Sequence, residues 1–299
     1  MKNPIFVTGS HRSGSTWVGK IIGNANGVRY VHEPFNMRKI RNNSPFKYWF
    51  EYVSDNSDKS YQEKAIRYLE SFYKPSFSAI LSNAINSRST KELYHFFKGF
   101  KGRVSDRTLI KDPIALFSSE WLYKNINCEV VMIIRHPAAF IASLKVKNWE
   151  FDFKNLLDQD DLMNDLLFEY KNDILDYSKN QPDMIDQGIL LWNIIYATVY
   201  RFKQQHEKDW FFVKHEDLSM DPVKEFKKMF NFLNLEFDKN IEREIIASSS
   251  ANESTDLKRD SKENIFSWKK RLSEEEINRI KRKTGPVWSK FYSESDWNQ

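Results

Sequence analysis

Residues 5–17 carry the sequence IFVTGSHRSGSTW, in which a short apolar run leads into a loop of glycine, serine and arginine. The run Ile5–Gly9 lacks polar alternation, which is typical of a parallel strand buried on both faces. From Thr16 onwards, apolar side chains recur every fourth residue, which predicts a helix that ends near Asn26 and Gly27. Strand, loop and helix in this order gather backbone N–H groups and a helix dipole at one point, an arrangement that binds phosphate.

The loop shares the outer glycine spacing of a Walker A motif, with Gly9 and Gly14, but it lacks the lysine of that motif. Ser15 stands at the lysine position, and the cation of the loop is Arg12. An ordinary P-loop kinase or ATPase is therefore disfavoured. Taken alone, the loop is equally compatible with a plain Gly/Ser turn that exposes an arginine.

Four further apolar runs predict strands, and helical patterns separate most of them. The predicted strands are Val28–His32, Thr108–Asp112, Glu129–Arg135 and Trp210–Lys214. Strands that alternate with helices form βαβ units. We therefore expect an α/β fold with a central, mostly parallel sheet flanked by helices.

Several helices are predicted outside these strands. They are Tyr61–Tyr73, Gln187–Gln205, a helix that begins at Asp221 and Pro222 and runs to Leu233, and a last helix opened by a capping box at Ser273–Glu276. Residues 41–106 are predicted to form a helical insertion between the second and third strands. No repeat or linker divides the chain, so we expect one domain over residues 1–299, with a polar loop at 247–263.

The composition excludes several classes of protein. Of the 299 residues 40% are hydrophobic, which is enough for a sizeable core and excludes a disordered chain. The single cysteine, Cys128, can form neither an intrachain disulfide nor a cysteine-based zinc site. The net charge of +5 is mild and does not indicate nucleic-acid binding.

The hydrophobic segments do not indicate a membrane protein. The longest apolar stretch, Gly188–Tyr200, is interrupted by Asn193 and is too short for a membrane span. The first predicted strand begins within a few residues of Met1, which leaves no room for a signal peptide. We therefore expect a cytoplasmic protein without membrane insertion.

Two segments resemble the nucleotide-binding motifs of the sulfotransferases that use 3′-phosphoadenosine 5′-phosphosulfate (PAPS), including those of bacterial type. Residues 12–17 are similar to the 5′-phosphosulfate loop, a basic residue followed by Ser-Gly-Thr/Ser-Thr and often Trp. Residues 129–137 resemble the 3′-phosphate motif, in which a strand ends in an arginine and a proline, and a serine lies eight positions after the arginine. The resemblance implies that PAPS is bound by Arg12, Ser13, Gly14, Ser15, Thr16, Trp17, Arg135 and Ser143.

Weaker similarity extends into the C-terminal part of the chain. Lys214–Leu218 resembles the Tyr-Glu-Asp-Leu end of the family's last core strand, and Trp268–Lys270 resembles its C-terminal Trp-Lys stretch. The Arg-Lys-Gly element that binds the 3′-phosphate in the family is missing, and Arg259 and Lys262 are the candidates to replace it. We expect residues 247–290 to close over the nucleotide. A solvated basic helix is the alternative interpretation of their positive charge.

The resemblance implies transfer of a sulfuryl group from PAPS to a hydroxyl or amine of an acceptor, such as a carbohydrate or another small molecule. This chemistry needs a base for the acceptor proton and a cation for the charge that develops on the departing bisphosphate. Arg12 suits the cation role because it lies in the phosphate loop and stays charged.

Glu33, directly after the second strand, is the candidate base, because it lies at the same sheet edge as the loop and resembles the catalytic glutamate of tyrosylprotein and several bacterial sulfotransferases. The alternative is a surface carboxylate that pairs with Arg12 or Arg29. His32 is a competing base, but side-chain alternation along a strand predicts that it points away from Glu33.

Three more residues have alternative roles. Lys111 ends the third strand and is expected to contact the transferring sulfonate. Asp112 is either a second base or a cap for the helix after Pro113. Trp17 either stacks on adenine, as the resemblance implies, or packs in the core. No spacing suggests a metal site, so we expect no metal cofactor.

Two other functions stay open from the sequence. A nucleotide kinase on the same scaffold would need a P-loop lysine and a Walker B aspartate, and a non-catalytic nucleotide-binding protein would need only the fold. Basic and aromatic side chains of the insertion, such as Lys47, Tyr48 and Trp49, suit a glycan and an aromatic acceptor alike.

Overall fold

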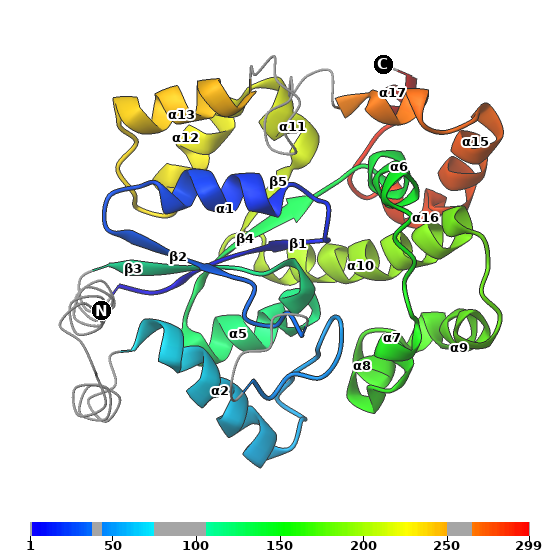
Figure 1. Cartoon of the computed structure of the whole chain (residues 1–299), viewed down its shortest axis with the longest axis horizontal. Helices are drawn as coiled ribbons and strands as arrows, with labels where there is room; N and C mark the ends of the chain where they lie inside the picture. Colours follow the sequence, from blue (N-terminus) through cyan, green and yellow to red (C-terminus); the bar gives the residue numbers. More distant parts are fainter. Residues whose placement is uncertain (1, 38–43, 75–105, 250–264, 299) are drawn as a thin grey trace, which may run out of the picture.

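The centre of the molecule is a five-stranded sheet in the order β2-β3-β1-β4-β5, and all neighbouring strands are parallel (Figure 1). It is seen in a computed structural model that describes residues 2–37, 44–74, 106–249 and 265–298. The strands are β1 (Ile5–Gly9), β2 (Val28–His32), β3 (Arg107–Lys111), β4 (Glu129–Ile134) and β5 (Phe211–Lys214). The strand order changes direction at β1, so the loop after β1 lies where open α/β sheets bind ligands.

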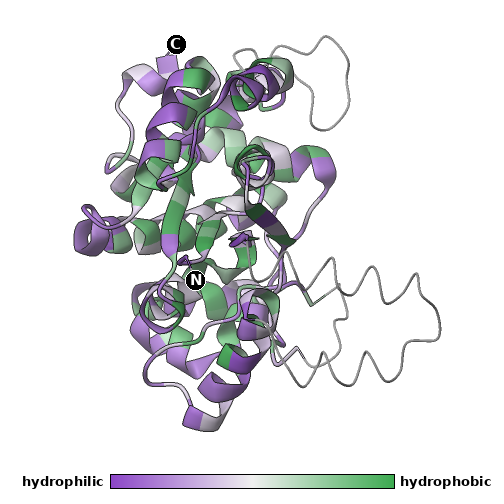
Figure 2. Cartoon of the chain, turned by 90° about the vertical axis from the view of Figure 1, so that its left-hand side faces the viewer, coloured by the Kyte–Doolittle hydropathy of each residue, from purple (hydrophilic) through white to green (hydrophobic). Residues whose placement is uncertain are grey.

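The sheet divides the hydrophobic core into two clusters. Ile5 and Val7 of β1 belong to one cluster, whereas Phe6 between them belongs to the other. Successive side chains of a strand point to opposite faces, so β1 buries apolar side chains on both faces of the sheet. Figure 2 shows the hydrophobic residues gathered on the strands and on the inner sides of the helices.

Three helices cover one face of the sheet. They are α1 (Ser15–Gly23), α12 (Pro222–Phe232) and α13 (Lys239–Ser249), which lie together in Figure 1. The predicted N-cap of α12 is present, because the Asp221 side chain accepts a hydrogen bond of 3.3 Å from the Lys224 amide. The smaller cluster of the core lies between these helices and the strands.

The opposite face is covered by α10 and by helices packed around it. Buried aromatic side chains of α10, including Trp192 and Tyr196, are fully enclosed there. The elements outside the first face are η1 (Pro113–Ser118), α5 (Ser119–Ile126), α6 (Pro137–Lys147), α7 (Lys154–Leu157), α8 (Asp160–Asp165), η2 (Phe168–Tyr170), α9 (Lys171–Lys179) and α10 (Met184–His206). The short helix α11 (His215–Met220) follows β5, and its Leu218 belongs to the smaller cluster on the first face.

The predicted insertion contains α2 (Lys59–Tyr73), which begins two residues before its predicted start and buries Ala65, Tyr68 and Leu69. Residues 41–43 and 75–105 of the insertion lie outside the described residues, as does most of the predicted loop at 247–263. After residue 264 the chain forms four short elements. They are η3 (Ser267–Lys270), α15 (Glu274–Lys283), α16 (Gly285–Trp288) and α17 (Ser295–Asn298).

The predicted α/β fold is confirmed, and each predicted strand is found within one residue of its expected ends. The first helix is shorter than predicted, because Asn24 already caps it and Gly27 belongs to the turn that follows. The capping box of α15 is present, with Ser273 and Glu276 in their expected roles. No helix within the described ranges is both long and apolar enough to span a membrane.

Candidate active site

The phosphate loop leads into α1 through Gly14, which has a positive φ of 93° and caps the helix. Only glycine fits there, because a Cβ atom on Gly14 would lie 2.7 Å from Cδ2 of His215. The ring of His215 thus lies directly against the loop. Burial lowers the pKa of His215 to about 3, so the ring is neutral at physiological pH.

Several buried hydrogen-bonding atoms in and beside this loop lack a partner among the described residues. They include the Ser13 hydroxyl and the Nδ1 atom of His11 in the loop and the Nε atom of Arg135 beside it. Leaving such groups unsatisfied costs about 1–3 kcal/mol each, so they favour a ligand that accepts hydrogen bonds. Together with the free amides at the start of a helix, they fit a phosphate-bearing ligand.

The two predicted nucleotide motifs meet in the folded chain. The Nε atom of Arg12 donates a hydrogen bond of 2.8 Å to the Ser143 hydroxyl, and the Arg135 guanidinium donates to the backbone carbonyl of Arg12. Ser143 lies about two turns into α6, as expected. Arg12 also has a positive φ of 63°, so the loop is bent at the residue that reaches the second motif.

A buried tyrosine of α10, Tyr196, connects the two motifs. The Tyr196 hydroxyl lies 2.8 Å from the Ser10 hydroxyl and accepts a hydrogen bond of 3.0 Å from the Arg135 amide. Sequence reasoning missed this role, because Tyr196 is one of many apolar or aromatic residues along α10. Only its hydroxyl, deep in the core and in need of a partner, distinguishes it.

The segment Lys214–Leu218 contributes a second supporting residue that sequence reasoning did not assign. Glu216 accepts a hydrogen bond of 3.0 Å from the His136 amide at the start of α6 and another of 2.9 Å from the Tyr292 hydroxyl. Burial raises the pKa of the Glu216 carboxyl. Glu216 therefore links the residue after Arg135 to the C-terminal part of the chain.

Glu33 follows β2 and forms an ion pair with Lys111 at the end of β3. The Lys111 Nζ atom lies 2.5 Å from Oε1 of Glu33, and Asn36 donates a hydrogen bond of 2.7 Å to Oε2. Burial raises the pKa of Glu33, but the hydrogen bond and charge of Lys111, with smaller effects of Asn36 and His32, outweigh it and hold the pKa below its ordinary value. The carboxylate is therefore ionised near neutral pH.

Arg29, one of the two alternative partners named for Glu33, donates to the Phe72 carbonyl and, at 2.8 Å, to the Thr108 hydroxyl, so it fastens α2 to the sheet.

The expectation that His32 points away from Glu33 is wrong. The His32 Nε2 atom lies 3.6 Å from Oε1 of Glu33, and its Nδ1 atom lies 2.9 Å from the Tyr30 hydroxyl. Alternation ends with the strand, because β2 stops at His32 and Glu33 has a positive φ of 48°. The two side chains therefore lie on the same side of the sheet edge.

Asp112 acts as a cap, which was one of its two predicted roles. Its Oδ1 atom accepts a hydrogen bond of 3.1 Å from the Ile114 amide, and its Oδ2 atom accepts one of 2.7 Å from the Phe35 amide. Burial raises the pKa of this fully enclosed carboxyl to about 7. Because both oxygens bind backbone amides, Asp112 fixes the turn that carries Glu33 and is poorly placed to act as a second base.

Trp17 packs against α12 with a T-shaped contact to Phe226, at 5.2 Å between ring centroids. Its indole N–H donates a hydrogen bond of 2.9 Å to the Ser248 hydroxyl. This favours the core-packing role for the face of the ring that meets Phe226. Stacking on adenine stays a prediction, and Arg259 and Lys262 lie outside the described residues.

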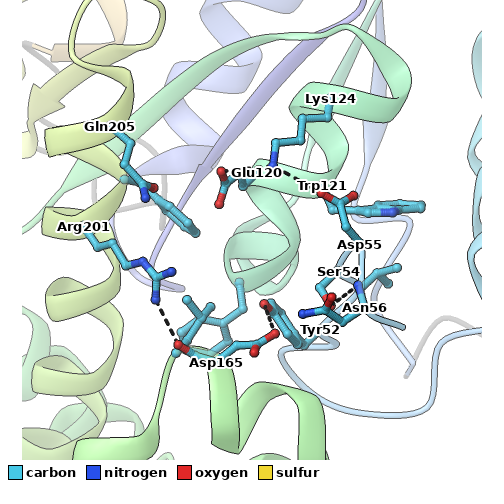
Figure 3. Close-up of a pocket in the computed structure, with 14 residues that line it drawn as sticks. Tyr52, Ser54, Asp55, Asn56, Glu120, Trp121, Lys124, Asp165, Arg201 and Gln205 are labelled. Atoms are coloured by element: carbon cyan, nitrogen blue, oxygen red, sulfur yellow. Dashed lines mark hydrogen bonds and ion pairs between the residues drawn. The ribbon is translucent and has the colours of Figure 1, made fainter. Parts of the chain in front are cut away.

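A separate polar cleft of about 290 Å³ lies between residues 52–56, α5 and α10 (Figure 3). Its charged side chains largely bind one another: Lys124 lies 3.2 Å from Asp55 and 3.3 Å from Glu120. Arg201 donates a hydrogen bond of 2.9 Å to the Asp165 carbonyl. None of the predicted site residues lines this cleft, so it is distinct from the candidate active site.

The comparison with protein families decides the class of the chain. A family model described as "Sulfotransferase family" matches residues 4–239. The chain belongs to the sulfotransferase family. It is thus an enzyme of the PAPS-dependent transferase class, as the motifs at residues 12–17 and 129–143 predicted. No curated protein is significantly similar to it in sequence.

Two solved sulfotransferase domains share the fold at low sequence identity. The sulfotransferase domain of the curacin biosynthetic pathway is 14% identical, with a TM-score of 0.50 and coverage of 95% of this chain and 98% of that domain. The sulfotransferase domain of the Synechococcus PCC 7002 olefin synthase is 15% identical, with a TM-score of 0.51 and coverage of 98% and 97%. A mouse sulfotransferase complexed with PAP, the desulfated nucleotide, is 14% identical, with a TM-score of 0.45 and coverage of 98% and 86%.

Proposed function

We propose that this sulfotransferase moves the sulfuryl group of PAPS to a hydroxyl or amine of an acceptor, a carbohydrate or another small molecule. One observation carries the proposal. Buried donors at the phosphate loop that have no partner in the described part of the chain lie on the same sheet edge as an ionised, partly buried glutamate. The first group suits the phosphates of the donor, and the second suits removal of a proton from the acceptor.

The nucleotide would be held by both motifs. The loop from Arg12 to Thr16 offers backbone amides, hydroxyls and one guanidinium to the 5′ end, and Trp17 would contact the base. Arg135 and Ser143 suit the 3′-phosphate, since a guanidinium fork and a hydroxyl are both strong donors to a phosphomonoester. No metal ion is needed in this proposal, because Arg12, Lys111 and Arg135 supply the positive charge.

The bound donor supplies an activated sulfuryl group, whose bond to the bisphosphate breaks as a bond to the acceptor forms. Glu33 takes the proton of the acceptor, which its ionised state allows. Arg12 stabilises charge on the departing bisphosphate, and Lys111 contacts the sulfonate. Asp112 and Asn36 keep Glu33 in place. Location in the cytoplasm remains part of this proposal.

Nucleotide binding in the absence of metal tests the proposal. PAP should raise the melting temperature of the chain in EDTA, because a ligand of the native state stabilises it. A set of candidate acceptors with labelled PAPS should then identify those that become sulfated. Stabilisation by ATP that requires Mg²⁺, together with no effect of PAP, would contradict the proposed function.

A further inference from the structure

Lys111 is a fully buried cation at the end of β3. The residue has no exposed surface, and its stem packs against α1, where a Cβ atom on Gly19 would lie 2.9 Å from its Cγ atom. The ring of Tyr30 closes the same space, since its Cε2 atom would also lie 2.9 Å from that Cβ atom. Because the stem is confined, only the last atoms can turn toward a new partner.

The proposed function assigns two anions to this one cation. In the structure, Nζ lies 2.5 Å from Oε1 of Glu33. In the reaction, the sulfonate of the donor needs positive charge at the same sheet edge. A carboxylate in a close ion pair is a weak base, because the paired cation stabilises its ionised form. The two tasks therefore conflict as long as Lys111 stays on Glu33.

We propose that Lys111 is a switch, which holds Glu33 in an ion pair before the donor binds and turns to the sulfonate once PAPS is in place. The turn frees Oε1 of Glu33 to take the acceptor proton. The acceptor's O–H or N–H bond then breaks as an O–H bond to Glu33 forms, and the proton leaves Glu33 for water after the products depart. This inference rests on the proposed function, because it requires PAPS as the donor.

Glu33 keeps its position when the lysine turns away. Asn36 still donates to Oε2 at 2.7 Å, and its amide bonds the Glu33 carbonyl at 3.2 Å. Asp112 still accepts from the Phe35 amide, which fixes the turn after Glu33. The switch thus changes the charge beside the base without releasing the base from its turn.

The charged and titratable groups around Glu33 come from two strands. His32 and Tyr30 face it from β2, while Lys111 faces it from the end of β3 and Asp112 from the residue that follows this strand. Burial raises the pKa of Glu33, and Lys111, Asn36 and His32 lower it, so moving the lysine away removes the largest of the effects that oppose burial. Binding of the donor should therefore make Glu33 easier to protonate.

The test is a titration of Glu33 by NMR of carboxyl-labelled glutamate, with the resonance identified by its loss in Glu33→Gln. The midpoint should move to higher pH when PAPS is added without acceptor. PAP, which lacks the sulfonate, should cause a much smaller movement. Glu51, a buried glutamate on the insertion, serves as an internal reference in the same spectra.

Two variants sharpen the experiment. Lys111→Met should raise the midpoint of Glu33 in the free protein and abolish its response to PAPS, because the switch is gone. Lys228→Met removes a lysine that lies 2.6 Å from Glu225 on α12, far along the chain from the site. It should leave both the midpoint and the response as in the unmodified chain.

The outcomes separate the switch from the proposed function. If PAPS and PAP both raise the melting temperature but the Glu33 midpoint stays the same, or moves to lower pH, the switch is wrong and the function stands. If neither nucleotide stabilises the protein, the proposed function fails and the switch fails with it. If Lys111→Met does not fold, the comparison of PAPS with PAP in the unmodified chain still decides.

Discussion

The carboxyl edge of the sheet has two halves that differ in how their polar groups are satisfied. In front of β1 and β4, Ser13 and Arg135 carry buried donor atoms that have no partner among the residues described. In front of β2 and β3, Glu33 and Asp112 already bind Lys111 and backbone amides. Unpartnered donors favour entry of an anion, whereas a closed ion pair must be opened before it reacts. Binding and chemistry are thus built separately and should be separable by mutation.

The largest effect is expected from Glu33→Gln, which keeps the shape of the side chain but removes its basicity. The value of kcat should fall by about two to four orders of magnitude, because general base catalysis is lost. PAP affinity should change little, since the residue lies on the other half of the edge. Steady-state kinetics and a PAP titration measure the two quantities. Near-full activity of Glu33→Gln, with loss of activity in His32→Asn, would move the base to His32.

The converse is expected from Arg135→Ala and Ser143→Ala. A charge-assisted hydrogen bond contributes about 1.5–3 kcal/mol and a neutral one about 0.5–1.5 kcal/mol. Arg135→Ala should therefore weaken PAP binding by roughly 10- to 150-fold, and Ser143→Ala by roughly 2- to 12-fold. Calorimetric titration with PAP compares them. Equal and negligible losses would place the 3′-phosphate elsewhere.

A smaller effect is expected on the stability of the fold at acidic pH, and it comes from His136, the residue after Arg135. Burial lowers the pKa of His136 to about 3 from 6.5, so the unfolded chain binds this proton first. Stability is therefore lost as pH falls from about 6.5 towards 3. His136→Phe keeps an aromatic ring among Trp268, Tyr292 and Trp297 and removes the titration.

Denaturant unfolding at two pH values measures the effect of His136. Between pH 6.5 and pH 5 the variant should lose about 1.6 kcal/mol less stability than the unmodified chain, because the unfolded imidazole goes from half to almost fully protonated over this range and a full proton contributes about 1.4 kcal/mol per pH unit. Equal losses in both proteins would show that His136 is protonated in the folded state. The same measurement on Lys228→Met gives the control.

The smallest effect is expected from a substitution in α15, a helix that belongs to neither half of the sheet edge. Lys283 pairs with Asp186 at 2.8 Å and is partly exposed, and Arg279 pairs with Asp183 at the same distance. Exposed pairs contribute at most about 1 kcal/mol, so Lys283→Ala should change the free energy of unfolding by less than that. PAP affinity should be unchanged. A tenfold loss of affinity would instead favour the interpretation that this basic region closes over the nucleotide.

Local sequence signals predicted the fold and the phosphate loop because both depend on short-range patterns. The buried strand Ile5–Gly9, the glycine at position 14 and the capping box at Ser273 are readable from neighbouring residues. The ion pair of Glu33 with Lys111 is not, since it depends on β2 lying beside β3 with His32 opposite Lys111. No pattern within either strand encodes that register.

The error about His32 has a similar cause. Side-chain alternation holds only inside a strand, and the backbone of Glu33 leaves the β region one residue after β2 ends. The supporting roles of Glu216 and Tyr292 also escaped prediction, because 76 positions separate the two residues and the bond between them needs the C-terminal part of the chain to reach α11.

Through Tyr196, the packing of the hydrophobic core influences which ligand fits the site. Its hydroxyl touches Ser10 in the loop after β1 and the Arg135 amide after β4, so α10 sets the spacing of the two motifs from beneath. Under the proposed function, that spacing is the span between the 5′ and 3′ groups of one nucleotide. A change in how α10 packs, far from any surface that a nucleotide touches, would then alter which bisphosphates fit. Selectivity for the donor would then depend partly on the packing of the interior of the molecule.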